Sequence, residues 1–408
     1  MHRTPLSLPA AMGVSHAAFL LLSGCAAPTE ASVPAAPSTA SVNGDGPADA
    51  REVAAPALHL TTVSPAGAIS HLNVADGSVT EIGPIPPADH VTTDGRYLFA
   101  AREGSVTVVD SGAWTWSHGD HFHYYSGAGR VVGEVRGAGT PTVVTGDRSI
   151  GIRFDGGEAV LVKVAPLADG EIEELFRMPV AAGPGAVVPL AYGAWVTESG
   201  ADGEGLRGVD EDGVAGAFTP CDDPGGTIAT TVGVVVACTG GAVLAVDGRP
   251  ARAAVIEAPP SDTPSAADAP GPSAVPTFTG REGRPTVSAL AGPRALWLLD
   301  TRARQWHRID VSEELASAVA VDDDAGHIVA VTTVGSLLAL DEGTGRVLSR
   351  TEGVGARGVH ARAAVLLADR DLTFVVVGTS ALAVDHRTGS VVDEFTLAHG
   401  GHTVLTGR

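Results

Sequence analysis

From residue 58 onward, the chain is a succession of short apolar, β-branched runs that are separated by Gly, Asp and Pro. Examples are SVTVVD (105–110), VGVVVAC (232–238) and LTFVVVG (372–378). Runs of strand length with turn residues between them, and without a sustained helical period, are typical of an all-β fold. The sequence therefore predicts an all-β domain over residues 58–408.

Larger units repeat within this domain. The segment GHIVAVTTVGSLLALDEGTGRVLSRTEG (326–353) aligns nearly position for position with RDLTFVVVGTSALAVDHRTGSVVDEFTLA (370–398). Each contains a strand, a tight turn, a second strand that ends in Asp, a turn with Thr-Gly, and a third strand. Related units begin near residues 88, 140, 184, 224, 285, 317 and 357. A spacing of about forty residues is typical of β-propeller blades, which have four strands each.

Two fragments remain outside these units. Residues 59–83 offer three strands, and residues 402–407 offer one. Joined, they would form one further blade from the two ends of the chain and leave no open sheet edge. We therefore expect a β-propeller closed by pairing of N-terminal and C-terminal strands, with eight blades, or with seven as the alternative. The stretch 257–276, rich in Pro, Ala and Ser, is expected to be a surface insertion.

The N-terminal segment has the features of an export signal. After a short basic beginning, an apolar stretch ends in AAFLLLSGC, with small residues directly before Cys25. This ending resembles the lipobox of bacterial lipoproteins, which implies that residues 1–24 are removed and Cys25 is lipidated. A secretory leader without a lipid is the alternative. Residues 25–57 are mainly small or polar, so we expect a disordered linker that tethers the domain to the outer face of the cytoplasmic membrane.

The cysteines indicate the compartment in which the protein works, and the net charge limits the kinds of partner that it can bind. With Cys25 assigned to the lipid, Cys221 and Cys238 remain as a pair, and in an oxidising compartment we expect a disulfide across one hairpin. The chain has 26 basic and 47 acidic residues, which gives a net charge of −21. This charge argues against nucleic acid as a partner, and it favours the capture of cations.

The stretch SHGDHFHYY (117–125) concentrates three of the 14 histidines. If a strand follows a Gly-Asp turn at Asp120, its period of two puts His121 and His123 on one face, and His118 can fold back towards them. Such histidines can share Zn²⁺ once an acid, for which Asp120 is a candidate, or a distant histidine completes a tetrahedron. An exposed polar strand, whose rings bond to backbone and water, is the other interpretation.

Three further histidines occupy matching positions in the predicted blades. His90, His360 and His402 each stand where the chain leads into the innermost strand of a blade. Equivalent positions of adjacent blades converge at one mouth of the channel, so we expect these imidazoles to face one volume, with Asp89 as a ligand or as a partner of one. The tract at 118–123 would then form a second site or reach over the mouth. Alternatively, each mouth histidine simply meets water.

Together these features resemble a known family. DHVTTDGRYLFA (89–100), HGDHFHYY (118–125), the pair Cys221 and Cys238, and the closing VVDEFTL and GGHTV are similar to AztD-type periplasmic zinc metallochaperones. The resemblance implies a secreted propeller that binds Zn and passes it to the solute-binding protein of an ABC importer. We expect the protein to be a monomer. Metal ligands are carried over only for the histidines present, because several other units have Pro, Gly or Ala at the equivalent position.

Three classes of function therefore compete. A lipid-anchored protein that captures zinc and hands it to a transporter partner needs no chemical step and is not an enzyme. A metal-dependent propeller hydrolase or lactonase needs hard oxygen ligands and an acid or base beside an open coordination position. A propeller that is only an interaction scaffold needs neither. Because the predicted mouth is richer in histidine than in paired Asp or Asn, the sequence favours the first class.

Overall fold

A computed structural model of the chain describes residues 50–117, 121–200, 203–248, 252–257, 277–281, 283–355 and 364–408. The predicted leader, most of the predicted linker and nearly all of the predicted insertion lie outside these ranges. Within them, the regular structure is β except for one short 3-10 helix, η1 (Ala165–Asp169), which confirms the all-β prediction. No described helix has the length and apolar character that a membrane span requires.

The described strands form a series of antiparallel sheets that follow the repeat seen in the sequence. The first sheet combines strands from both ends of the chain, in the order β34 (His402–Thr406), β2 (His59–Val63), β3 (Ile69–Asn73) and β4 (Val79–Glu81). The next contains β5 (His90–Thr93), β6 (Tyr97–Arg102), β7 (Ser105–Asp110) and β10 (Arg130–Arg136). A small additional sheet has the order β1 (Arg51–Val53), β9 (Phe122–Ser126) and β8 (Ala113–Ser117).

Six further sheets are built from consecutive strands. They are β11 (Pro141–Val144), β12 (Ser149–Phe154), β13 (Glu158–Lys163) and β14 (Glu174–Pro179); β15 (Val187–Leu190), β16 (Gly193–Gly200), β17 (Gly203–Val209) and β18 (Ala215–Pro220); β19 (Thr227–Ala229), β20 (Val234–Cys238), β21 (Gly241–Val246) and β22 (Arg252–Glu257); β23 (Thr286–Leu290), β24 (Ala295–Asp300) and β25 (Gln305–Asp310); β26 (Leu315–Ala320), β27 (His327–Thr332), β28 (Leu337–Asp341) and β29 (Val347–Thr351); and β30 (Val365–Ala368), β31 (Leu372–Val377), β32 (Ser380–Asp385) and β33 (Ser390–Thr396).

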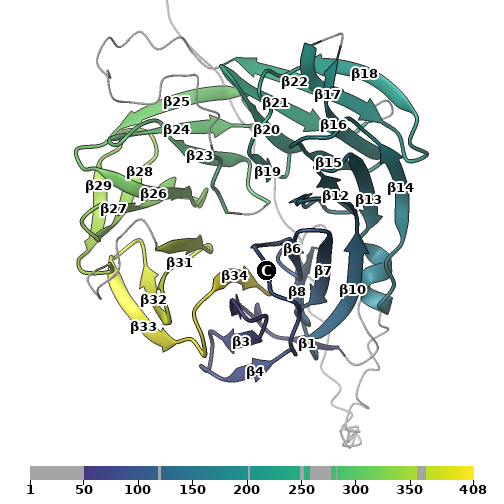
Figure 1. Ribbon diagram of the computed structural model, residues 1–408. Helices are drawn as coiled ribbons and strands as arrows, with labels where there is room; N and C mark the ends of the chain where they lie inside the picture. The colour runs from purple at the N-terminus through teal and green to yellow at the C-terminus, as the bar shows by residue number, and fades with distance from the viewer. Residues whose placement is uncertain are drawn as a thin grey trace, which may run out of the picture. The chain divides into compact units, whose positions relative to one another are not determined.

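The two ends of the domain meet in one sheet. β34 pairs with β2, and His402 lies opposite Val63 in the register. In Figure 1 the yellow C-terminal strand lies beside the purple strands of the N-terminal part. This is the pairing of N-terminal and C-terminal strands that the sequence predicted.

Hydrophobic clusters connect each sheet to its neighbours. Phe99 of β6 and Ile152 of β12 share one cluster, and Leu60 of β2 shares another with Phe374 of β31. All four side chains are almost completely buried. Alternate residues of a strand point to opposite faces, so each sheet can bury one set of side chains against the sheet before it and another against the sheet after it. The sheets are thereby arranged around a common centre, as in a β-propeller (Figure 1).

Each sheet has two ends, and the direction of its strands tells which residues lie at which end. β5 and β7 run parallel, because β6 pairs antiparallel with both. His90, at the start of β5, is level with Ala101 of β6 and hence with Val106 near the start of β7. We call this end, where the first strand of a sheet begins, the proximal end. The opposite end, where the first and second strands connect, is the distal end.

The N-terminal strand β1 lies within the segment predicted as linker. It pairs with β9, so that Glu52 lies opposite Tyr125. The described structure therefore starts before the domain boundary predicted at residue 58, and the small sheet that carries the histidine tract includes the start of the described chain.

The predicted disulfide between Cys221 and Cys238 is present, with a Cα–Cα distance of 5.2 Å. Its location differs from the expectation of a bond across one hairpin. Cys221 follows β18 and Cys238 ends β20, so the bond connects two consecutive sheets. The reason is the register, in which the hairpin partner of Cys238 in β21 is Gly241.

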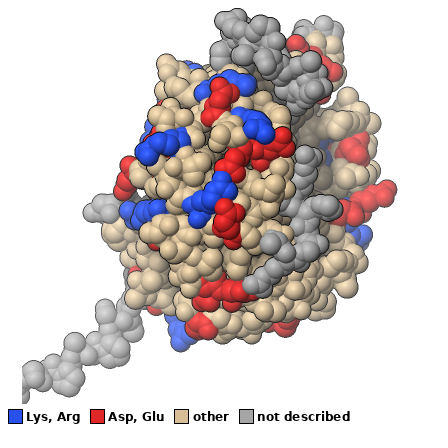
Figure 2. Space-filling model, turned by 90° about the vertical axis from the view of Figure 1, so that its left-hand side faces the viewer, with Lys and Arg blue, Asp and Glu red and all other residues tan. Residues whose placement is uncertain are grey.

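Charged side chains of both signs lie next to one another on the side of the domain that carries β29 and β33 (Figure 2). Arg350 of β29, for example, forms ion pairs with Glu313 and Glu352. The excess negative charge of the chain is therefore not gathered into a single acidic surface on this side.

Candidate metal centre

Asp323 and His327 face each other across the turn that connects β26 with β27, at the distal end of their sheet. Gly326 has a φ of +65°, which glycine adopts most readily, and it turns the start of β27 back over Asp323. Oδ1 of Asp323 accepts a hydrogen bond of 3.0 Å from the backbone N–H of His327, and Oδ2 lies 2.7 Å from Nδ1 of the ring. The Asp323 side chain is fully buried, and that of His327 is nearly so.

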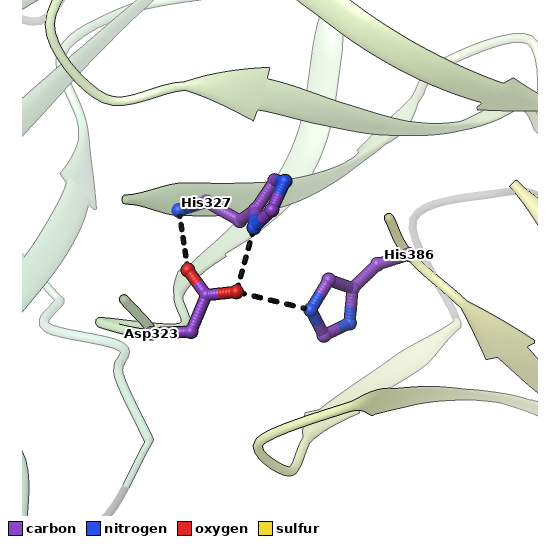
Figure 3. Close-up of side chains that lie close together, drawn as sticks. All are labelled: Asp323, His327 and His386. Carbon is purple, nitrogen blue, oxygen red and sulfur yellow. Dashed lines mark hydrogen bonds and ion pairs between the residues drawn. The ribbon is translucent and has the colours of Figure 1, made fainter. Parts of the chain in front are cut away.

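His386 approaches the same carboxylate from the next sheet. It follows β32 directly, and its side chain is fully buried. Nε2 of His386 lies 3.8 Å from Oδ2 of Asp323, while Nδ1 lies 3.2 Å from the hydroxyl of Thr373 in β31. Within the described part of the chain, Nε2 has no hydrogen-bond partner. Figure 3 shows both imidazole rings turned towards the one carboxylate.

Burial and charge set the protonation states of this group. Burial acts to raise the pKa of Asp323, but hydrogen bonds from the backbone and ring of His327, with the charges of both histidines, outweigh it, so the pKa lies below its ordinary value. Burial, and secondly the neighbouring His327, lowers the pKa of His386. At neutral pH the carboxylate is therefore ionised and His386 is neutral, which are the states that bind metal ions.

The three side chains fit a metal ion in type and spacing. Carboxylate oxygen and imidazole nitrogen are ordinary zinc ligands, and one such atom from each residue lies within 4.8 Å of the other two. In a tetrahedron with bonds of about 2.0–2.1 Å, ligand atoms are roughly 3.3 Å apart. The separations of 2.7 and 3.8 Å from Oδ2 of Asp323 lie on either side of that value. Among the residues that the structure describes, no other group of three His, Cys, Asp or Glu is as close.

Two of the histidines predicted at the channel mouth lie together. The ring centroids of His90 and His402 are 6.2 Å apart, and the rings are nearly perpendicular. Burial, and secondly the nearby His402, lowers the pKa of His90. His90 begins β5 and His402 begins β34, and each of these strands lies at an edge of its sheet. Both histidines therefore lie at the proximal end. Asp89 directly precedes β5, whereas His360 lies outside the described residues. A metal site at this mouth stays a prediction.

The histidine tract lies on the hairpin β8–β9, which follows the distal end of β7. Its members His118 and Asp120 lie outside the described residues. The ring centroids of His121 and His123 are 4.8 Å apart, and Nδ1 of His123 lies 2.6 Å from Oε1 of Glu52 in β1. Because the hairpin leaves its sheet at the end opposite to His90, strand direction favours a second site over a tract that covers the mouth.

Sequence reasoning did not single out Asp323, His327 or His386. It looked for histidines at the start of innermost strands, which lie at the proximal end, whereas this group lies at the distal end. The aligned repeats do contain a signal, since His386 occupies the position of Glu342 in the preceding repeat. Equivalent positions lie at the same end of neighbouring sheets. The spacing Asp-x-x-x-His at 323–327, together with His386 in the next repeat, would therefore have indicated the group.

The fold and this group of side chains define a β-propeller protein with a candidate metal centre. No protein-family model and no curated protein matches the sequence of the chain. Two solved structures of AztD from Citrobacter koseri share the fold, each with a TM-score of 0.68 over 86% of this chain and 97% of the AztD chain, at 18% and 19% identity. Sqt1 from Chaetomium thermophilum, solved with the N-terminus of ribosomal protein L10, reaches a TM-score of 0.50 at 11% identity, covering 79% of this chain and 94% of Sqt1. At these identities the likeness concerns the fold.

Proposed function

We propose that the chain is an extracytoplasmic, lipid-anchored protein that binds zinc and passes it, without a chemical step, to the zinc-binding component of an ABC importer. The observation that carries this proposal is the buried carboxylate of Asp323 with the imidazoles of His327 and His386 directed at it. The sequence features that resemble AztD-type proteins imply zinc as the cargo and a solute-binding protein as the acceptor, and the fold shared with AztD is consistent with that resemblance.

The number of ligands suits a site that must release its ion. Three protein ligands leave the fourth position of a zinc tetrahedron open to water or to a ligand from another protein. A ligand of the acceptor that reaches this buried position can attach to the ion before all three protein ligands have left it, so transfer requires that the distal end open to the acceptor. The turns that carry the ligands are held by the sheets, so little conformational freedom is lost when the ion binds.

The other histidine groups are proposed as additional metal-binding positions. His90 and His402 offer two imidazoles at the proximal end, and His121 and His123 offer two at the distal hairpin. Among the residues that the structure describes, neither pair is part of a three-residue group with a buried carboxylate such as the candidate centre has. We therefore expect both pairs to hold zinc less tightly than the candidate centre, with the tract serving to load or release the ion.

Metal content is the direct test of this function. The protein is purified without a histidine tag, loaded with Zn²⁺ and desalted, and its zinc is compared with that of the variant Asp323→Asn, His386→Ala. We expect the wild type to retain tightly bound zinc that the variant lacks. Equal zinc in the two proteins would contradict the candidate centre, and hydrolase activity that requires the metal would favour the enzyme class instead.

Anchoring has its own test, because it rests on the LSGC motif at residues 22–25. The variant Cys25→Ser should be released from the membrane fraction or remain as an unprocessed precursor. Fractionation like the wild type would contradict lipidation without bearing on the metal centre.

A further inference from the structure

Arg387 contacts the same carboxylate oxygen as the two histidines of the candidate centre. Its Nε lies 3.7 Å from Oδ2 of Asp323, and its Nη2 lies 2.9 Å from Oδ1 of Asp371. The carboxylate of Asp323 is fully buried, whereas the side chains of Arg387 and Asp371 are 45% and 59% exposed. The guanidinium therefore links the buried carboxylate of the centre to a carboxylate at the surface.

This position makes the contacts of Arg387 depend on whether a metal ion is bound. Without an ion, Arg387 supplies positive charge to the ionised carboxylate of Asp323. A divalent cation on Oδ2 takes over that role and repels a guanidinium a few ångströms away. Asp371 offers a second partner on the outer side, so Arg387 can withdraw from Asp323 and keep an ion pair.

Further carboxylates lie near Asp323, and two of them are paired with arginines of their own, Asp322 with Arg284 and Asp324 with Arg370. Burial raises the pKa of Glu342, and the charges of Asp322 and Asp323 raise it further. Carboxylates grouped in this way attract and retain cations. A protein that delivers its ion needs an opposing contribution, and Arg387 is the arginine that contacts Asp323 in the described part of the chain.

We propose that Arg387 competes with the metal ion for Asp323, and that it thereby weakens binding and accelerates release. This inference rests on the metal-binding function proposed above. Arginine stays protonated and has no lone pair to offer a metal, so Arg387 acts through the charge at Asp323 and not as a ligand.

The test uses the full chain and Zn²⁺ as the probe. Affinity is measured by competition with a fluorescent zinc indicator, and release by stopped flow into excess EDTA. The signal of the candidate centre is the part that disappears in the variant His386→Ala. We expect Arg387→Gln to bind zinc roughly tenfold more tightly and to release it correspondingly more slowly, as removal of one nearby, partly screened charge implies. Arg387→Lys, which keeps the charge, should stay close to the wild type.

Two further variants distinguish the contact between Arg387 and Asp323 from the general effect of removing a charge near the centre. Arg370→Gln is the matched control, because Arg370 lies 3.7 Å from the exposed Asp324 and forms no ion pair with Asp323. It should leave affinity and release unchanged. Asp371→Asn should weaken binding, because Arg387 then keeps only Asp323 as its partner. Combined with Arg387→Gln, the same change should have no further effect.

The outcomes distinguish the two proposals. If zinc binding is lost in His386→Ala but unaltered in Arg387→Gln, the role of Arg387 is wrong and the metal-binding function stands. An equal effect of Arg370→Gln, or an Asp371→Asn effect that persists without Arg387, would also overturn competition at Asp323. If the wild type binds no zinc that depends on His386, both proposals fail.

Discussion

Nε2 of His386 lies 3.8 Å from Oδ2 of Asp323, although the two residues belong to different sheets and are distant in sequence. The contact exists because the turns after β26 and β32 lie at the same end of adjacent sheets. Neither turn could place these atoms alone. The candidate metal centre is therefore a product of sheet-on-sheet packing, and its ligands should keep their positions when surface loops are altered.

Removal of one ligand should abolish tight binding. Changes to residues that merely orient a ligand lower metal affinity by about 10–100-fold, so His386→Ala should weaken zinc binding by more than roughly a hundredfold. Competition titration against a zinc indicator measures the change. His307→Ala is the control, because His307 is an exposed histidine of β25. Similar affinities for both variants and the wild type would show that the tight site lies elsewhere.

The orientation of His386 should depend on Thr373. The buried hydroxyl of Thr373 lies 3.2 Å from Nδ1 of His386, on the side of the ring away from Asp323. Thr373→Val keeps the shape and removes the hydrogen bond, so we expect zinc affinity to fall about tenfold with the fold retained. Circular dichroism checks the fold and the same titration checks the affinity. An unchanged affinity would mean that packing alone orients the ring.

Stability should fall in acid because of a buried histidine pair. The rings of His59 and His71 stack with centroids 3.7 Å apart, and burial, with a smaller effect of His59, lowers the pKa of His71 to about 3. The unfolded chain binds a proton at His71 near pH 6.5, whereas the folded chain does so only near pH 3. Between these values the unfolded state holds more protons, so the free energy of unfolding decreases by roughly 1.4 kcal/mol per pH unit as the pH falls.

Urea denaturation from pH 7 to pH 4 tests this dependence. His71→Gln removes the titrating group and should reduce the loss of stability in that range, while His59 and His386 still contribute part of it. His307→Gln, at an exposed position, should keep the slope of the wild type. A His71→Gln variant with the wild-type slope would contradict the burial of His71 as a neutral ring.

Loss of the disulfide should destabilise the domain without unfolding it. Cys221 and Cys238 are 17 positions apart, and a bond that closes a loop of this length stabilises by roughly 3 kcal/mol in the chain-entropy model. The variant Cys221→Ser, Cys238→Ser should therefore lower the urea midpoint. Both sulfurs also lie in one buried cluster between two sheets, so the effect includes some loss of packing. An unchanged midpoint would mean that this packing alone holds the two sheets together.

The fold could be predicted from the sequence because the strand-length apolar runs and the repeat of about forty residues both indicate a propeller. Strand-length runs such as SVTVVD became β7, and the fragments at the two ends became β2, β3, β4 and β34 of one sheet. The proximity of His90 and His402 followed from their equivalent positions in neighbouring units. The cysteine pair was recognised from composition, but the sheets that it connects depend on a register that composition does not contain.

The candidate centre was not accessible in the same way. Its members take different positions in their units, since Asp323 precedes β27, His327 begins it and His386 follows β32. Their meeting depends on how far one sheet is rotated against the next and on which rotamers the core permits. The complete burial of a carboxylate is a property of that packing, and the acidic run at 322–324 reads in the sequence like any exposed turn.

The most direct measurement of the central claim is the location of the ion. A crystal of the zinc-loaded protein, with anomalous data collected on both sides of the zinc edge, identifies the metal without prior assumptions about its ligands. We predict a peak about 2.0–2.1 Å from Oδ2 of Asp323, Nδ1 of His327 and Nε2 of His386. A peak found only between His90 and His402, or only at the histidine tract, would contradict this assignment, as would a loaded crystal with no peak at all.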